Sequence, residues 1–166
     1  SGTGFNINST RVVNLSDKDN DGIPDNQDLC PNVPGSAENR GCPEIINQEE
    51  KEMLKQAINN LFFESGKDVI LQTSFNSLNE LVKILNSNPK SHVMIVGHTD
   101  NVGDYANNIV LSKKRAAAVK QYLVKNGISQ NRINTNGVGS DQPLTTNDTE
   151  EGRMANRRVE IVFMSK

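Results

Sequence analysis

Apolar residues from position 47 onward recur at the spacings of alternating helices and strands. The run from Val93 to Val96 is continuous, which is typical of a strand covered on both faces. The pattern predicts helices at 47–58, 75–85 and 112–126, a further short helix, and strands at 61–63, 93–96, 133–138 and 159–163. Ser112 is predicted to cap the third helix and Gly127 to end it. This order favours an α/β sandwich with right-handed crossovers.

The segment before these elements has a different composition. Between Asp17 and Pro43 it is rich in Asp, Asn, Gly and Pro, and its four prolines exclude a long helix. We therefore expect an irregular linker over residues 17–46, stabilised by something other than apolar burial, and a folded domain over residues 47–166.

Charge and apolar content exclude some classes of partner. The 166 residues carry a formal net charge of −2 and no long basic tract, which argues against nucleic acid. No run approaches the roughly 20 apolar residues of a membrane helix. The chain begins abruptly at Ser1, so we interpret residues 1–16 as an N-terminal extension and expect membrane contact only through parts of a longer protein.

An aspartate ladder occupies residues 17–28 of the linker. Asp stands at positions 1, 3, 5, 9 and 12 of this stretch and Gly at position 6, the spacing of an EF-hand calcium loop. Calcium takes six to eight oxygen ligands, so a short chain must turn sharply around it. We predict six ligand residues, with Ile23 using its carbonyl and Asp25 binding directly or through water: Asp17, Asp19, Asp21, Ile23, Asp25 and Asp28.

The ladder departs from a true EF-hand, because position 12 is Asp rather than Glu and no helices flank it. Its continuation Asp28-Leu29-Cys30-Pro31 resembles a thrombospondin type-3 repeat, which implies a calcium-loaded, cysteine-linked spacer. The alternative is an acidic loop that water alone solvates. Five carboxylates within twelve residues repel one another unless a cation neutralises them, which favours calcium.

Cys30 and Cys42 are the only cysteines, and both lie in the linker. We predict a disulfide formed in an oxidising compartment. The rival is a metal pair, but His92 and His98 are distant in sequence and complete no four-ligand zinc pattern.

Several longer motifs follow in a fixed order. They read Gly-His-Thr-Asp at 97–100, Leu-Ser-Lys-Lys-Arg-Ala at 111–116, Gly-Val-Gly at 137–139, Asn-Asp-Thr at 147–149 and Gly-Arg-Met-Ala-Asn-Arg-Arg-Val-Glu at 152–160. This set closely resembles the OmpA-like C-terminal domain over about residues 50–164. The resemblance implies a βαβαβ(α)β sandwich with a mixed four-stranded sheet.

The resemblance also implies non-covalent binding of peptidoglycan through the diaminopimelate of its peptide stem. Diaminopimelate keeps a free end with one ammonium and one carboxylate, so a receptor needs an acid and a base held close together. Asp100 after a strand and Arg115 early in a helix are suitable types on adjoining elements. By motif position, the family's binding role also falls on four further residues: Thr99, Asn108, Leu111 and Arg157.

Two other classes of function remain as alternatives. A calcium-stabilised adhesion spacer would rest on the linker alone. A cell-wall hydrolase would need a nucleophile, and no serine or cysteine motif supplies one, so we predict no enzyme activity. His98 lies beside Asp100, but we expect it to make hydrogen bonds beneath the loop. By family analogy we expect the periplasmic face of the outer membrane of a Gram-negative bacterium, with an inner-membrane stator as the alternative.

Overall fold

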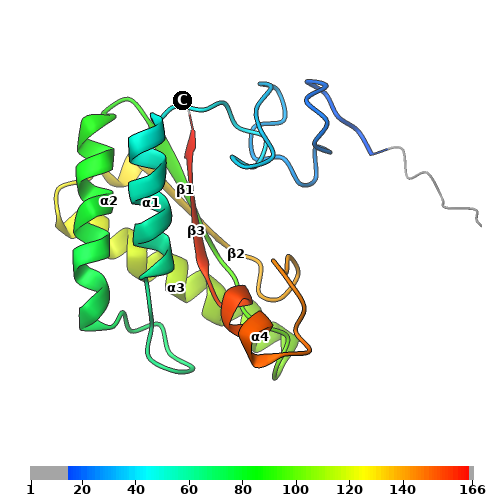
Figure 1. The fold of residues 1–166 in the computed structure, drawn as a ribbon, viewed down its shortest axis with the longest axis vertical. Helices are drawn as coiled ribbons and strands as arrows, with labels where there is room; N and C mark the ends of the chain where they lie inside the picture. Colours follow the sequence, from blue (N-terminus) through cyan, green and yellow to red (C-terminus); the bar gives the residue numbers. More distant parts are fainter. Residues whose placement is uncertain (1–14, 165–166) are drawn as a thin grey trace, which may run out of the picture.

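The computed structural model describes residues 15–164; residues 1–14, most of the predicted N-terminal extension, and residues 165–166 lie outside it. Helices cover one face of a sheet (Figure 1). The elements are helices α1 (Gln48–Asn59), α2 (Phe75–Ser87), α3 (Tyr105–Lys125) and α4 (Glu150–Asn156), and strands β1 (His92–Gly97), β2 (Ile133–Gly137) and β3 (Val159–Met164). Single 3-10 turns precede α2 at Gln72–Ser74 and β2 at Gln130–Arg132.

The sheet is mixed, as predicted, with β1 at its centre. Helix α3 joins β1 to its parallel neighbour β2, and β3 pairs with β1 in the antiparallel sense. The strand order is β2-β1-β3. The α/β fold class is therefore confirmed, and a right-handed crossover stays a prediction.

The prediction of four strands is wrong for the described part of the chain, where the sheet has three. The expected strand at 61–63 forms only an isolated bridge between Phe63 and Ile70. The hydroxyl of Ser74 accepts from the amide of Phe62 at 2.8 Å and donates to its carbonyl at 3.2 Å. The amide of Phe62 is therefore taken by a side chain, and the carbonyl of Phe62 pairs only locally, with the amide of Leu71 at 2.9 Å, so the segment does not join the sheet.

Helix α3 begins at Tyr105, earlier than the predicted start at Ser112. The side chain of Asp104 caps it by accepting from the amide of Asn107 at 2.8 Å. Ser112 is instead fully buried in the helix interior. Helix α1 begins as expected, with a reciprocal capping box between Asn47 and Glu50.

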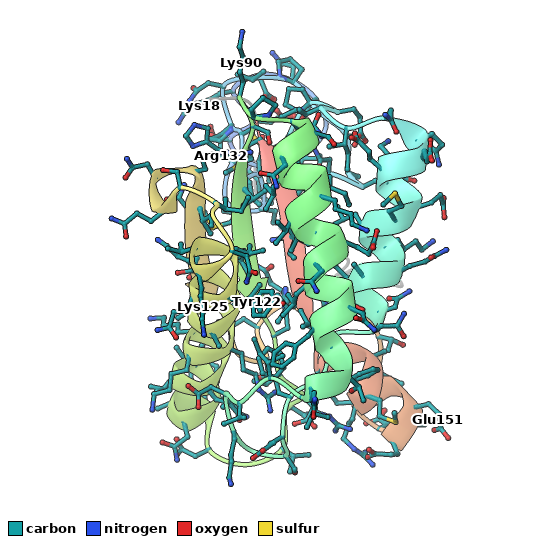
Figure 2. All side chains as sticks on the ribbon, turned by 90° about the vertical axis from the view of Figure 1, so that its left-hand side faces the viewer. Lys18, Lys90, Tyr122, Lys125, Arg132 and Glu151 are labelled. Atoms are coloured by element: carbon teal, nitrogen blue, oxygen red, sulfur yellow. A yellow bond between two sulfur atoms is a disulfide. The ribbon has the colours of Figure 1, made fainter. Side chains whose placement is uncertain are left out.

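The core lies between the sheet and the helices. Its fully buried members come mainly from α2, β1, α3 and β3: Leu78, Leu81, Leu85, Val93, Ile95, Val119, Leu123 and Phe163. Figure 2 shows Tyr122 reaching from α3 toward α2, where its hydroxyl bonds Asn79 at 2.6 Å and its ring stacks on Phe75. Arg132 donates to carbonyls at the C-terminal end of α2 and in the turn after it: Leu85, Asn88 and Ser91.

The linker, residues 17–46, contains no helix or strand. The predicted disulfide between Cys30 and Cys42 is present, with their Cα atoms 5.0 Å apart. No helix within residues 15–164 has the length and apolar character to cross a membrane.

Candidate functional site

Two glycines bring α3 unusually close to the end of the sheet. Gly97 and Gly137 are register partners on β1 and β2. A methyl group on either would overlap the backbone of Ser112 or Lys113 on α3. The glycines of the Gly-His-Thr-Asp and Gly-Val-Gly motifs therefore set the distance between the sheet and the helix that carries Arg115.

The loop after β1 is held from both sides. The amide of Thr99 donates to the carbonyl of Gly139 at 2.8 Å, and the amide of His98 donates to that of Arg158 at 2.8 Å. The hydroxyl of Ser112 accepts from the amide of Gly139 at 2.9 Å. Asp100 is therefore carried by a loop that these hydrogen bonds hold in place.

Asp100 is held by Arg157, which arrives from the end of α4. The Arg157 Nη1 lies 2.7 Å from Asp100 Oδ2, and the other Asp100 oxygen accepts from the amide of Val102 at 3.0 Å. Arg157 Nη2 also lies 2.8 Å from Glu150, so the guanidinium bridges two carboxylates. Hydrogen bonds from Arg157 to Glu150 and to Asp100 raise the pKa of Arg157.

Arg115 is buried on α3 with a different set of neighbours. Its Nε donates to the carbonyl of Lys67 at 2.9 Å, and its guanidinium carbon lies 5.1 Å from the centre of the Phe63 ring. Burial and the charge of Arg157 lower the pKa of Arg115, whereas the charges of Asp100 and Asp68 oppose that shift. Arg115 therefore shares one electrostatic environment with Asp100 and Arg157.

Asp100 and Arg115 do not bond each other directly in the part of the chain that the structure describes. Within residues 15–164 the Nε of Arg115 makes a hydrogen bond, and its two terminal nitrogens make none. The predicted acid and base thus lie near one another, and the direct ion pair is Asp100–Arg157. Arg157, predicted on motif position alone, is tied to the centre of the site.

The other predicted residues shape the loop. Thr99 is buried and donates to the carbonyl of Asp100 at 2.8 Å. Asn108 donates to the carbonyl of Val102 at 3.0 Å, and Leu111 is half-buried at the start of the Leu-Ser motif. The sequence did not assign Phe63 or Glu150 to this site. Phe63 lies in a segment that matches the family motifs only loosely. Glu150 precedes Arg157 by seven positions, which is two turns of a helix, but the predicted short helix was given no bounds.

His98 contradicts the expectation that its ring makes hydrogen bonds. The side chain is fully buried, and neither ring nitrogen makes a hydrogen bond to the described residues. Its Nε2 lies 3.5 Å from Glu160, which also pairs with Arg158 at 2.7 Å. Burial raises the pKa of Glu160, but its interactions with His98 and with the guanidinium of Arg158 outweigh that effect and lower the pKa of Glu160 to about 2.

A second cluster of polar groups lies in the linker. Asp17, Asp19 and Asp21 each offer a carboxylate oxygen within 4.8 Å of the others. One oxygen each of Asp17, Asp19 and Asp28 is buried without a hydrogen-bond partner among the described residues. Burial raises the pKa of Asp19, and the charges of Asp21, Asp28 and Asp17 raise it further. Unpaired, mutually repelling carboxylate oxygens fit a hard divalent cation such as calcium.

The remaining ladder residues differ in their surroundings. Asp28 is buried, with one oxygen accepting from the amide of Cys30 at 2.7 Å. Asp25 instead accepts from the amide of Lys18 at 3.0 Å, and a hydrogen bond from the Ser16 side chain lowers its pKa. The cysteines bond each other, so neither offers a thiolate to the alternative zinc site.

The fold and the site define a small α/β binding domain with paired acidic and basic side chains where the central strand ends. The sequence agrees with this class, because residues 62–157, more than half of the chain, match the model of the OmpA family. The chain belongs to the OmpA family.

Individual relatives agree with the family assignment. Outer membrane porin F of Pseudomonas aeruginosa is 33% identical over 96% of this chain and 47% of its own length. The peptidoglycan-binding protein ArfA of Mycobacterium tuberculosis is 43% identical over 56% of this chain and 28% of its own. The chain thus spans half or less of these two curated relatives. The peptidoglycan-associated lipoprotein of Burkholderia pseudomallei has a similar solved structure, with a TM-score of 0.56, 27% identity and coverage of 62% of this chain and 86% of that one.

Proposed function

We propose that this chain binds peptidoglycan without cleaving it, by holding the free zwitterionic end of diaminopimelate between Asp100 and Arg115. The observation that carries the proposal is the state of Arg115, a largely buried residue whose two terminal nitrogens keep access to solvent and make no hydrogen bond within residues 15–164. These free donors lie in the field of Asp100 without bonding it, so they are suited to a ligand that brings a carboxylate to Arg115 and an ammonium to Asp100.

In this proposal each charge of the site has its own role. The terminal nitrogens of Arg115 are suited to a two-pronged bond with the ligand carboxylate. Asp100 has lone pairs beyond those used by Arg157 and Val102, and these accept from the ligand ammonium. Thr99, Asn108 and Leu111 line the site beside the Asp100–Arg115 pair. Lysine lacks the terminal carboxylate, so a site in which Arg115 binds that carboxylate prefers diaminopimelate over lysine.

Two kinds of comparison support this function. The names of ArfA and of the Burkholderia lipoprotein refer to peptidoglycan, and the relative from Pseudomonas is named as an outer membrane protein. We infer that the chain works at the periplasmic face of the outer membrane and anchors that membrane to the cell wall. A spacer resting on the linker alone would leave the charges around Asp100 without a role.

Retention on purified sacculi tests the proposal. Asp100→Ala and Arg115→Ala should each reduce retention by roughly thirtyfold or more, because each leaves a buried charge of the Asp100–Arg115 pair unpaired. Lys114→Ala, which removes an exposed neighbouring cation, is the matched control and should bind like the wild type. Equal retention of all three variants would refute the assignment. Release of soluble fragments over time would point to a hydrolase instead.

We also propose that the linker binds calcium as a thrombospondin type-3-like repeat. The unpaired buried oxygens of Asp17, Asp19 and Asp28 support it, and the sharp turn at Gly22, where φ is +92°, brings the ladder back on itself. Asp21 and the carbonyl of Ile23 complete the central set, with Asp25 at its margin. When bound, calcium would neutralise carboxylates that otherwise repel one another.

A chelator experiment tests the calcium proposal. Excess chelator should lower the melting temperature and speed protease cleavage within residues 17–46, and added calcium should reverse both effects. Asp19→Asn should abolish the response to calcium, whereas Glu38→Gln, an exposed acid of the same linker, should keep it. Identical melting and cleavage with chelator and with calcium would contradict the proposal.

A further inference from the structure

Arg115 is contacted by a short hairpin that is far from it in sequence. The hairpin comprises residues 62–71, and two of its members touch the guanidinium. The carbonyl of Lys67 accepts from Nε at 2.9 Å, and the Phe63 ring lies 5.1 Å from the guanidinium carbon. One contact takes an edge of the guanidinium and the other is a cation–π contact with the ring, so together they restrict its rotation.

The hairpin is itself well fixed. Glu64 and Val69 are joined by a backbone hydrogen bond of 2.8 Å, and the amide of Leu71 donates to the carbonyl of Phe62 at 2.9 Å. The turn between them passes through Gly66, whose φ of +68° favours glycine. The Ser74 hydroxyl fastens the base of the hairpin through Phe62. The ring and the carbonyl that touch Arg115 therefore lie on one rigid unit.

These contacts use only one of the five N–H groups of Arg115. A long arginine side chain normally loses conformational freedom when it binds a ligand. Here that freedom is already restricted, and the four terminal N–H groups stay available for a carboxylate. The hairpin also excludes water from one side of the guanidinium, which strengthens a charge-assisted bond.

We propose that Phe63 and the turn at Gly66 are positioning elements that pre-orient Arg115 for the ligand carboxylate. This inference rests on the proposed function, because it assumes that Arg115 binds the ligand carboxylate. Phe63 itself makes no bond to the ligand and acts through Arg115. The hairpin thereby becomes part of the specificity for diaminopimelate, although no charged motif marks it in the sequence.

Titration with free diaminopimelate, followed by NMR, tests the inference on the whole chain. Phe63→Leu keeps apolar volume but removes the π-face, and should weaken binding roughly three- to thirtyfold; Phe63→Tyr should restore it. Phe62→Leu, at the exposed neighbour, is the matched control and should bind like the wild type. The Nε–Hε resonance of Arg115 should shift in Phe63→Leu and stay in place in Phe62→Leu, an effect that mere destabilisation would not produce.

A second variant guards against a folding defect at Phe63. A methyl group on Gly66 would meet nothing within 4 Å, so Gly66→Ala strains only the turn and leaves the core untouched. It should weaken binding as well, because the Lys67 carbonyl would move. If Arg115→Ala abolishes binding while Phe63→Leu and Gly66→Ala bind like the wild type, the positioning role is overturned and the proposed function stands. If Arg115→Ala binds normally, both fail.

Discussion

Arg40 of the linker forms a 2.6 Å ion pair with Glu160 on strand β3. The two side chains are only 22% and 24% exposed, and Arg40 also donates to Gln142 at 2.7 Å. Close by, the amide group of Asn39 donates to the carbonyl of Phe163 at 3.3 Å. The linker is therefore docked against the sheet through defined contacts rather than acting as a free tether.

Replacing Arg40 should loosen this docking. Arg40→Gln keeps much of the side-chain volume but removes the charge facing Glu160, and we expect it to cost about 1–2 kcal/mol, since Arg158 still neutralises Glu160. Limited proteolysis should then cut residues 17–46 faster than in the wild type. Lys55→Gln, which removes an exposed cation of α1, should leave the cleavage rate unchanged. Equal cleavage of Arg40→Gln and wild type would argue against docking through this pair.

Glu160 should make stability fall in acid. Its pKa is about 2 in the folded chain, below the ordinary value of 4.5. A lowered folded pKa gives stability that is present above pH 4.5 and is lost as the pH falls toward 2. Glu160→Gln should therefore be less stable than the wild type at pH 7, by roughly 2–3 kcal/mol, with the difference vanishing near pH 2.

Urea unfolding at several pH values measures this difference. Glu151→Gln is the control, because Glu151 points into solvent from α4 (Figure 2) and makes no ion pair within residues 15–164. Its stability should follow the wild type across the pH range. A Glu160→Gln curve parallel to that of the wild type would show that the carboxylate contributes no pH-dependent stability.

Elements with a complete local signal were predictable from sequence. The apolar run of β1 and the helical spacing of α2 mark elements whose burial is decided by their own residues. The start of α3 was misjudged, because Ser112 and Asp104 are both good capping types and only tertiary packing distinguishes them. The predicted strand at 61–63 does not join the sheet, because its backbone bonds the hydroxyl of Ser74 and pairs locally with residues 69–71.

In the candidate site, too, sequence predicted some residues and missed others. The motifs marked Asp100, Arg115 and Arg157 as binding residues, because each motif is local in sequence. Two partners of these charges are not local, since Arg157 meets Asp100 across 57 positions of sequence and Lys67 reaches Arg115 through a backbone carbonyl. A backbone acceptor carries no residue signature, so sequence cannot reveal it.

Gly97 should tolerate no side chain. A methyl group there would overlap the backbone of Ser112, and backbone atoms cannot yield as a flexible side chain can. Gly97→Ala should cost about 1–3 kcal/mol in urea unfolding and speed hydrogen exchange of the Thr99 amide, which bonds Gly139. Gly103→Ala adds a methyl group in open space, so it should cost about 1 kcal/mol from its positive φ alone. Unchanged exchange at Thr99 in Gly97→Ala would contradict the role of this close approach.

Arg157 should strengthen ligand binding by holding Asp100 in place. Without it the carboxylate keeps only the amide of Val102, and its free oxygen can rotate away from the ligand ammonium. Arg157→Ala should therefore weaken binding of free diaminopimelate roughly tenfold to a hundredfold, as expected for losing a charged hydrogen bond. Arg153→Ala is the matched control, because Arg153 pairs with the same Glu150 at 3.1 Å but makes no bond to Asp100.

The sign of this effect separates two roles for the Asp100–Arg157 pair. If Arg157 competes with the ligand ammonium for Asp100, its removal frees an acceptor and binding becomes tighter. If Arg157 orients Asp100, binding becomes weaker. The second outcome is expected because Arg157 is itself anchored at 2.8 Å by Glu150, and a fixed cation orients its partner. Calorimetric titration of Arg157→Ala beside Arg153→Ala distinguishes the two, and tighter binding in Arg157→Ala alone would overturn the orienting role.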